Sequence, residues 1–152
     1  MVSLTDAGAT RRAHAVTVNQ VFLGDTILNW FLGGALTFFP GFVDRTLRKA
    51  GSPQMLPNLL YMAIGLGFLG YSAWQTLVLA RQRMGAPALV FAALMALVPF
   101  VALTLALAVL SLPLKQGWRV VLWVGNTYMG LLGLWYLVLE AAMRREGLGG
   151  EL

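Results

Sequence analysis

Residues 16–39 read VTVNQVFLGDTILNWFLGGALTFF, an apolar run that ends at Pro40 and Gly41. A helix needs about 20 apolar residues to cross the hydrocarbon core of a bilayer, and this run is long enough. Proline followed by glycine stops a helix, which places the end of the span at residue 39. The run is too long and too polar for a secretory signal peptide, and no small-residue cleavage pattern follows it. It therefore predicts a membrane-spanning helix.

Three further apolar runs cover residues 58–80, 88–112 and 119–143. Pro57 and Pro87 stand just ahead of the first two of these, and residues 114–119, LKQGWR, form a short turn. Helices joined by a few residues must be antiparallel neighbours. We therefore expect an all-α membrane protein, one integral membrane domain over residues 1–152, built as a four-transmembrane-helix up-down-up-down bundle. Residues 1–15 are expected to form a tail or a short interfacial helix.

The composition supports the membrane assignment and narrows the chemistry. Of the 152 residues, 59% are hydrophobic and 11% are charged, whereas soluble domains carry roughly 25% charged residues. A soluble enzyme is thereby excluded. The chain has no cysteine and a single histidine, so we expect no metal site and no cofactor. The net charge of +5 comes from basic residues at the ends of the apolar runs, which indicates contact with phospholipid and not with nucleic acid.

The linker at residues 41–58 alternates apolar and charged residues at helical spacing. This pattern is typical of a short amphipathic helix that lies in the headgroup region, here between the first and second spans. The basic residues on its polar face, Arg45, Arg48 and Lys49, are predicted to contact lipid headgroups.

Asp25 is the only ionisable residue well inside a predicted span. At 1.5 Å per residue it would lie about 14 Å deep, near the midplane. A carboxylate there costs at least about 2.5–3.5 kcal/mol, so it must face the bundle interior and find partners. Asp25 shares one side of its helix with Thr26 and Asn29. If this side meets the polar side of the fourth span, Asn126 is the natural hydrogen-bond partner of Asp25, provided that helix tilt closes an offset of several Å along the helix axes. These four residues form the candidate intramembrane polar site.

Two interpretations of this site follow from the sequence. Polar side chains inside a membrane often hold helices together by hydrogen bonds. Alternatively, a buried carboxylate binds a proton or a cation in a transport path. Small residues are expected at the helix contacts, because they let two backbones approach closely. The predicted packing positions are Gly33, Gly67, Gly70, Gly130 and Gly133.

The most favoured function is that of a small non-catalytic membrane protein, an accessory or structural subunit that associates through small-residue helix faces. The alternatives are a proton- or cation-coupled transporter or channel using Asp25, and a lipid-binding or lipid-modifying protein. Expected partners are the lipid bilayer and a second copy or another membrane protein. Nine of the eleven basic residues are arginine, which suggests a GC-rich bacterial genome and the bacterial cytoplasmic membrane. Both termini are predicted to be cytoplasmic, because Arg11 and Arg12 directly precede the first span.

Overall fold

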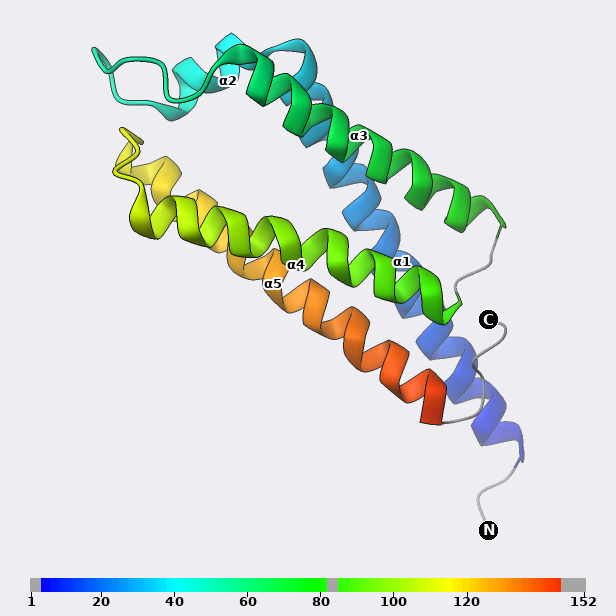
Figure 1. Ribbon diagram of the computed structural model, residues 1–152. Helices are drawn as coiled ribbons and strands as arrows, with labels where there is room; N and C mark the ends of the chain where they lie inside the picture. Colours follow the sequence, from blue (N-terminus) through cyan, green and yellow to red (C-terminus); the bar gives the residue numbers. More distant parts are fainter. Residues whose placement is uncertain (1–3, 82–84, 146–152) are drawn as a thin grey trace.

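The computed structural model describes residues 4–81 and 85–145, with side chains from residue 19 onward (Figure 1). This part of the chain is helical, with one short helix and four long ones. The helices are α1 (Leu4–Phe38), α2 (Pro40–Leu47), α3 (Asn58–Arg81), α4 (Ala86–Val109) and α5 (Gln116–Arg145). Each long helix contains a segment long and apolar enough to cross a membrane. The predicted up-down-up-down bundle, with a short helix between its first two spans, is confirmed.

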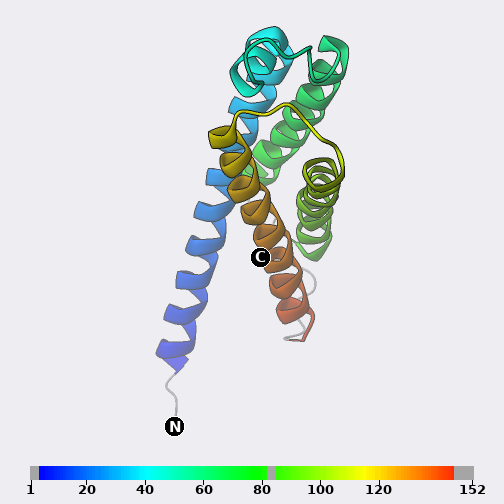
Figure 2. The ribbon, with the colours of Figure 1, turned by 90° about the vertical axis from the view of Figure 1, so that its left-hand side faces the viewer.

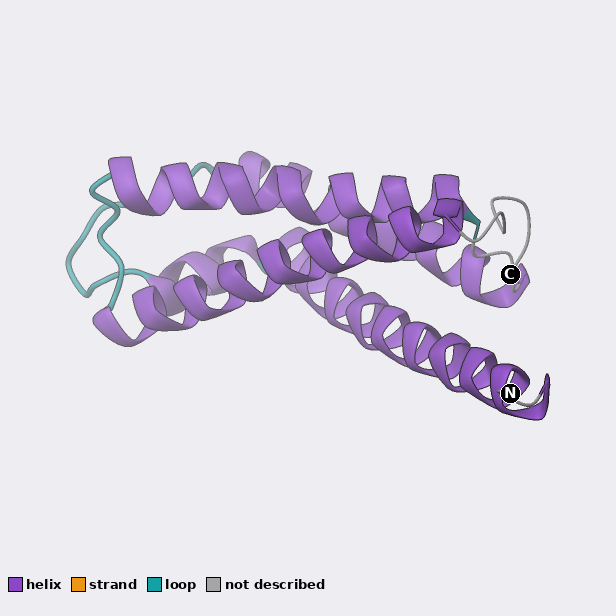
Figure 3. Ribbon diagram, turned by 90° about the horizontal axis from the view of Figure 1, so that it is seen from below, coloured by secondary structure: helices purple, strands orange, loops and turns teal. Residues whose placement is uncertain are grey.

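The first helix starts earlier than the sequence analysis predicted. It begins at Leu4 and continues without a break to Phe38, so residues 4–15 form neither a separate tail nor a separate interfacial helix. The physical reason is that no proline interrupts residues 4–38, and a helix that is already formed propagates readily. The first turns of α1 diverge from the other helices (Figure 3) and extend beyond their ends (Figure 2).

The four long helices form two hairpins. Helix α1 packs along α3, and α4 packs along α5, whereas close approach between the two hairpins is sparse (Figure 2). The α1–α3 hairpin closes at its turn through α2 and residues 48–57, and the α4–α5 hairpin closes through residues 110–115. Both turns lie at one end of the bundle, the loop end. The start of α1, the end of α3, the start of α4 and the end of α5 lie at the other, the terminal end (Figure 1).

Glycine sets the spacing of the α1–α3 hairpin. A Cβ placed on Gly65 would lie 2.7 Å from the Thr37 backbone nitrogen and 2.8 Å from the Gly33 carbonyl oxygen. A Cβ on Gly33 would lie 2.9 Å from the Leu69 backbone nitrogen. Real Cβ atoms do not approach backbone this closely, so the two helices can touch only because both positions are glycine.

Two sets of contacts join the hairpins, one at each end. At the terminal end, the Phe22 ring of α1 lies edge-on to Tyr136 of α5, with centroids 6.0 Å apart, and the Trp74 ring of α3 lies edge-on to Phe91 of α4, with centroids 4.6 Å apart. At the loop end, the Lys49 amide donates to the Pro113 carbonyl at 2.7 Å, and the Lys115 amide donates to the Leu47 carbonyl at 2.9 Å. The bundle is therefore fastened at both ends.

The outer faces of the long helices carry large apolar side chains. Phe31 is 75% exposed, Leu59 78% and Val138 65%. In water such a continuous apolar surface would drive aggregation, whereas hydrocarbon is its natural solvent. With four apolar helices of spanning length, the fold defines a multi-pass helical membrane protein.

Candidate functional site

Three buried polar side chains link α1 to α3 near the terminal end. The Gln75 side-chain amide of α3 donates to Asp25 Oδ2 at 2.6 Å, and the Asn29 amide donates to Gln75 Oε1 at 3.3 Å. Gln75 is thus held between two residues one helical turn apart on α1. We call Asp25, Asn29 and Gln75 the polar lock.

The polar lock is closed to solvent and lipid. Asp25 is 7% exposed, Asn29 6% and Gln75 0%. Among the described side chains, none forms an ion pair with Asp25. Its hydrogen-bonding neighbours are the neutral amides of Gln75 and Asn29. Amide donors satisfy the carboxyl oxygens without adding a second buried charge, which is the pattern of interhelical hydrogen bonding in membranes.

The position of Asp25 along the bundle follows from its partner on α3. Its partner Gln75 lies six residues before the end of α3 at Arg81, which is about 9 Å along the helix axis. The other end of α3, at Asn58, is about 26 Å away. Asp25 therefore lies nearer to the terminal end of α3 than to its loop end, and its position near the midplane of a membrane stays a prediction. Asp25 belongs to the terminal half.

Thr26 and Asn126 also have different partners from those expected. The Thr26 hydroxyl donates to the Phe22 carbonyl of its own helix at 2.7 Å, and so takes no part in the polar lock. The Asn126 amide of α5 donates to Thr104 Oγ1 of α4 at 2.7 Å. The predicted pairing of Asn126 with Asp25 is wrong. Thr104 lies near the loop end of α4 whereas Gln75 lies near the terminal end of α3, so the two sites occupy opposite halves of the bundle.

Gln75 is the residue that sequence reasoning missed. It is the sole Gln, Asn, Asp or Glu of α3 beyond its first residue, Asn58. Its isolation within an apolar run was the sequence signal that could have identified it. A single strongly polar residue within an apolar run needs a buried partner. Pairing it with Asp25 required the relative register of α1 and α3, which the Gly33–Gly65 contact sets.

Two buried tyrosine hydroxyls belong to side chains that lie where the two hairpins meet. They belong to Tyr71 of α3 and Tyr136 of α5, which are 6% and 0% exposed, and neither hydroxyl has a hydrogen-bond partner among the described residues. The Tyr71 ring stacks on Trp74 with centroids 5.7 Å apart. Asp25 stands three residues after Phe22, whose ring contacts Tyr136, so it lies on the side of α1 where the two hairpins meet.

The predicted packing glycines divide into two groups. Gly33, Gly130 and Gly133 are buried at helix contacts. An added Cβ would lie 2.9 Å from Leu69 at Gly33, 2.9 Å from Phe100 at Gly130 and 2.7 Å from Leu97 at Gly133. Gly67 and Gly70 are exposed, and a Cβ on either would meet nothing within 4 Å. Inside this chain, the close contact on α3 is made by Gly65 instead.

The amphipathic linker contains a second polar cluster, centred on Asp44 of α2. Its Oδ1 accepts hydrogen bonds from the Met55 amide at 3.0 Å and from the Tyr61 hydroxyl at 3.1 Å, and Arg48 Nε lies 2.9 Å from Oδ2. The spacing of Asp44 and Arg48 was the sequence signal for this pair. Arg48, predicted to meet lipid headgroups, is thus occupied within the chain, whereas the side chains of Arg45 and Lys49 are exposed.

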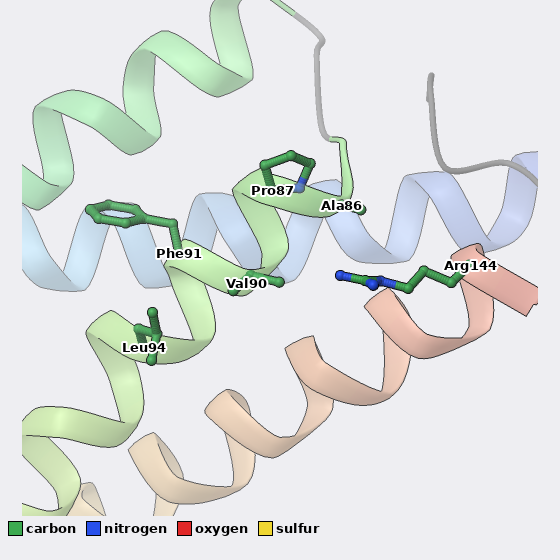
Figure 4. A pocket seen from close by; sticks show the side chains of 6 residues that line it. All are labelled: Ala86, Pro87, Val90, Phe91, Leu94 and Arg144. Atoms are coloured by element: carbon green, nitrogen blue, oxygen red, sulfur yellow. The ribbon is translucent and has the colours of Figure 1, made fainter.

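A shallow groove of about 670 Å³ lies beside α4 at the terminal end, apart from the polar lock. Arg144 of α5 points toward it and forms an ion pair with Glu140 (Figure 4). The remaining lining comes from one helix: Ala86, Pro87, Val90, Phe91 and Leu94. Within the described residues, no three His, Cys, Asp or Glu side chains gather as metal ligands would.

Comparisons with protein-family models, with curated proteins and with solved structures give no match. The class of protein therefore rests on the fold and on the contacts above. The chain is a multi-pass helical membrane protein made of two hairpins, each held by a hydrogen bond between polar side chains of its two helices.

Proposed function

We propose that this chain is a non-catalytic integral membrane protein that acts as an accessory or structural subunit of a membrane assembly. The observation that carries the proposal is the use of its strongest intramembrane polar groups. Asp25, Gln75 and Asn126 each hydrogen-bond across a hairpin, from one helix to its neighbour. Groups used in this way stabilise a scaffold, because each helix pair is fixed in register.

The exposed side of α3 supplies a surface for association. Ala63, Gly67 and Gly70 are all exposed, and the two glycines leave open space where a side chain would stand. Small residues at spacings of three and four residues let a second helix approach closely in a bilayer. We assign the partner helix of the proposed assembly to this side of α3.

Bulk at this surface is expected to release the protein from its assembly. In mild detergent extracts, we expect the wild-type protein to migrate on native electrophoresis as a complex larger than one chain. The double variant Gly67→Leu with Gly70→Leu should migrate as a single chain. Ala102→Leu is the matched control, because Ala102 is an exposed position on α4, and it should behave as wild type. A wild-type protein that migrates as a lone bundle would contradict the proposal.

The same proposal places the chain in a bacterial cytoplasmic membrane with both termini in the cytoplasm. Six basic residues flank the spans at the terminal end and five at the loop end, a small difference in the direction that the positive-inside rule favours. The four spans bring both termini to one side. Alkaline phosphatase fused after residue 152 should therefore be inactive, and fused after Pro53, in the loop, it should be active. The reverse pattern would overturn the orientation.

A further inference from the structure

A polar pocket of about 520 Å³ lies at the loop end, between the turn of the α1–α3 hairpin and the turn of the α4–α5 hairpin. Basic and hydroxyl side chains line it on both sides, together with the last residues of α4. Its lining includes Lys49, Ser52, Leu110, Ser111, Pro113 and Arg119.

The fold brings together two cations that are distant in the sequence. The backbone of Lys49 is held against the opposite turn by its hydrogen bond to the Pro113 carbonyl at 2.7 Å. Arg119 stands in the first turn of α5 and donates one hydrogen bond, to the Leu112 carbonyl at 3.3 Å. A guanidinium has five donors, so most of those on Arg119 stay available. The Lys49 ammonium makes no hydrogen bond or ion pair with any described side chain.

The charge around the pocket is unbalanced. Asp44 is the one acidic residue between positions 26 and 139, and Arg48 already pairs with it. Lys49 and Arg119 therefore line the same pocket, and no carboxylate is among its lining residues. Two unpaired cations beside a pocket attract a compact anion, and a phosphate group accepts bonds from both at once.

The position of the pocket favours a lipid as the source of that phosphate. The amphipathic helix α2 lies at the same end of the bundle (Figure 1), at the level of the headgroups. Leu107 of α4 and Leu110, just after the helix, also line the pocket, and they lead from it toward the apolar span. A bound lipid would thus keep its phosphate at the surface and its acyl chains against α4.

We propose that this pocket binds the phosphodiester of an anionic phospholipid, with Lys49 and Arg119 contacting the phosphate oxygens and Ser52 and Ser111 donating hydrogen bonds. Basic pockets between transmembrane helices are a known mode of anionic lipid recognition. The bound lipid joins the turns of the two hairpins, which otherwise meet there through a short backbone bridge between Arg48 and Leu114. This inference is independent of the proposed accessory function.

Native mass spectrometry of the full chain in detergent tests the site. We expect phosphatidylglycerol to bind with a stoichiometry of one and phosphatidylcholine to bind at least tenfold more weakly. Lys49→Gln and Arg119→Gln should each weaken phosphatidylglycerol binding about fivefold, and the double variant about 25-fold, as expected for removal of one surface cation each. Arg45→Gln is the matched control, since Arg45 is an exposed cation at the same end and outside the pocket.

Three results would overturn the proposal. The first is a double variant that binds phosphatidylglycerol as tightly as wild type. The second is an Arg45→Gln protein that loses as much binding as the pocket variants, which would indicate a diffuse charge effect. The third is displacement of phosphatidylglycerol by inorganic phosphate at a concentration equal to that of the lipid, which would make free phosphate the ligand. Both pocket side chains are exposed, so the variants are expected to fold, and thermal unfolding of each one checks this.

Discussion

Replacing Gly65 with alanine is expected to lower the free energy of unfolding by about 3 kcal/mol, since the added methyl group overpacks a closed contact. The new carbon would stand 2.7 Å from the Thr37 nitrogen and 2.8 Å from the Gly33 carbonyl oxygen. Both are backbone atoms, so no side-chain rotation relieves the overlap and the two helices must move apart. That movement also stretches the polar lock, because Gln75 lies on the same helix. Unfolding in mixed micelles with increasing dodecyl sulfate measures the change.

Gly67→Ala is the matched control for this prediction. Gly67 stands two residues further along α3, and a Cβ there meets nothing within 4 Å. Alanine exceeds glycine in helix propensity by about 1 kcal/mol in water, so this variant should be as stable as wild type or slightly more stable. Equal losses from the two substitutions would show that α3 tolerates no alanine anywhere, and the argument from the Gly33–Gly65 contact would fail.

The sequence predicted the architecture because the apolar runs and their breaks are unambiguous. Pro40, Pro57 and Pro87 mark helix starts that the structure places at or next to these residues. Span length and short connections then leave one arrangement of four helices. The start of α1 was mistaken because residues 4–15 are polar but contain no helix-breaking proline. Hydropathy reports where a span lies and says little about how far its helix continues into water.

The candidate site was predicted less well, for a reason of register. The sequence places Asp25 and Asn126 on inward helix sides, but it does not say how far one helix is shifted along another. That shift is set by particular contacts, such as Gly33 against Gly65. Once α1 is shifted, Gln75 is the amide that reaches Asp25, and Asn126 reaches Thr104 in the other half of the bundle. The residue types were predictable and their pairing was not.

Asp25→Ala is expected to lower the free energy of unfolding by about 3 kcal/mol, because it leaves the buried Gln75 amide without an acceptor. Asp25→Asn keeps an acceptor oxygen at the same place and should stay within about 1 kcal/mol of wild type. The double variant Asp25→Ala with Gln75→Leu removes both partners, and it should recover much of the loss, since paired removal leaves no buried polar group unsatisfied. The same micelle unfolding experiment measures all three, and the cycle gives the coupling energy.

The Asn variant also separates the scaffold role of Asp25 from a role in transport. In the polar lock Asp25 serves as a hydrogen-bond acceptor and its charge is not needed. Asp25→Asn should therefore keep both the fold and the native assembly. Proton uptake by vesicles that contain the wild-type protein, recorded with a pH-sensitive dye, should equal that of empty vesicles. Uptake that appears with wild type and disappears with a folded Asp25→Asn protein would assign Asp25 to a proton path. In that case the buried hydroxyls of Tyr71 and Tyr136, which have no hydrogen-bond partner among the described residues, are the next groups to test.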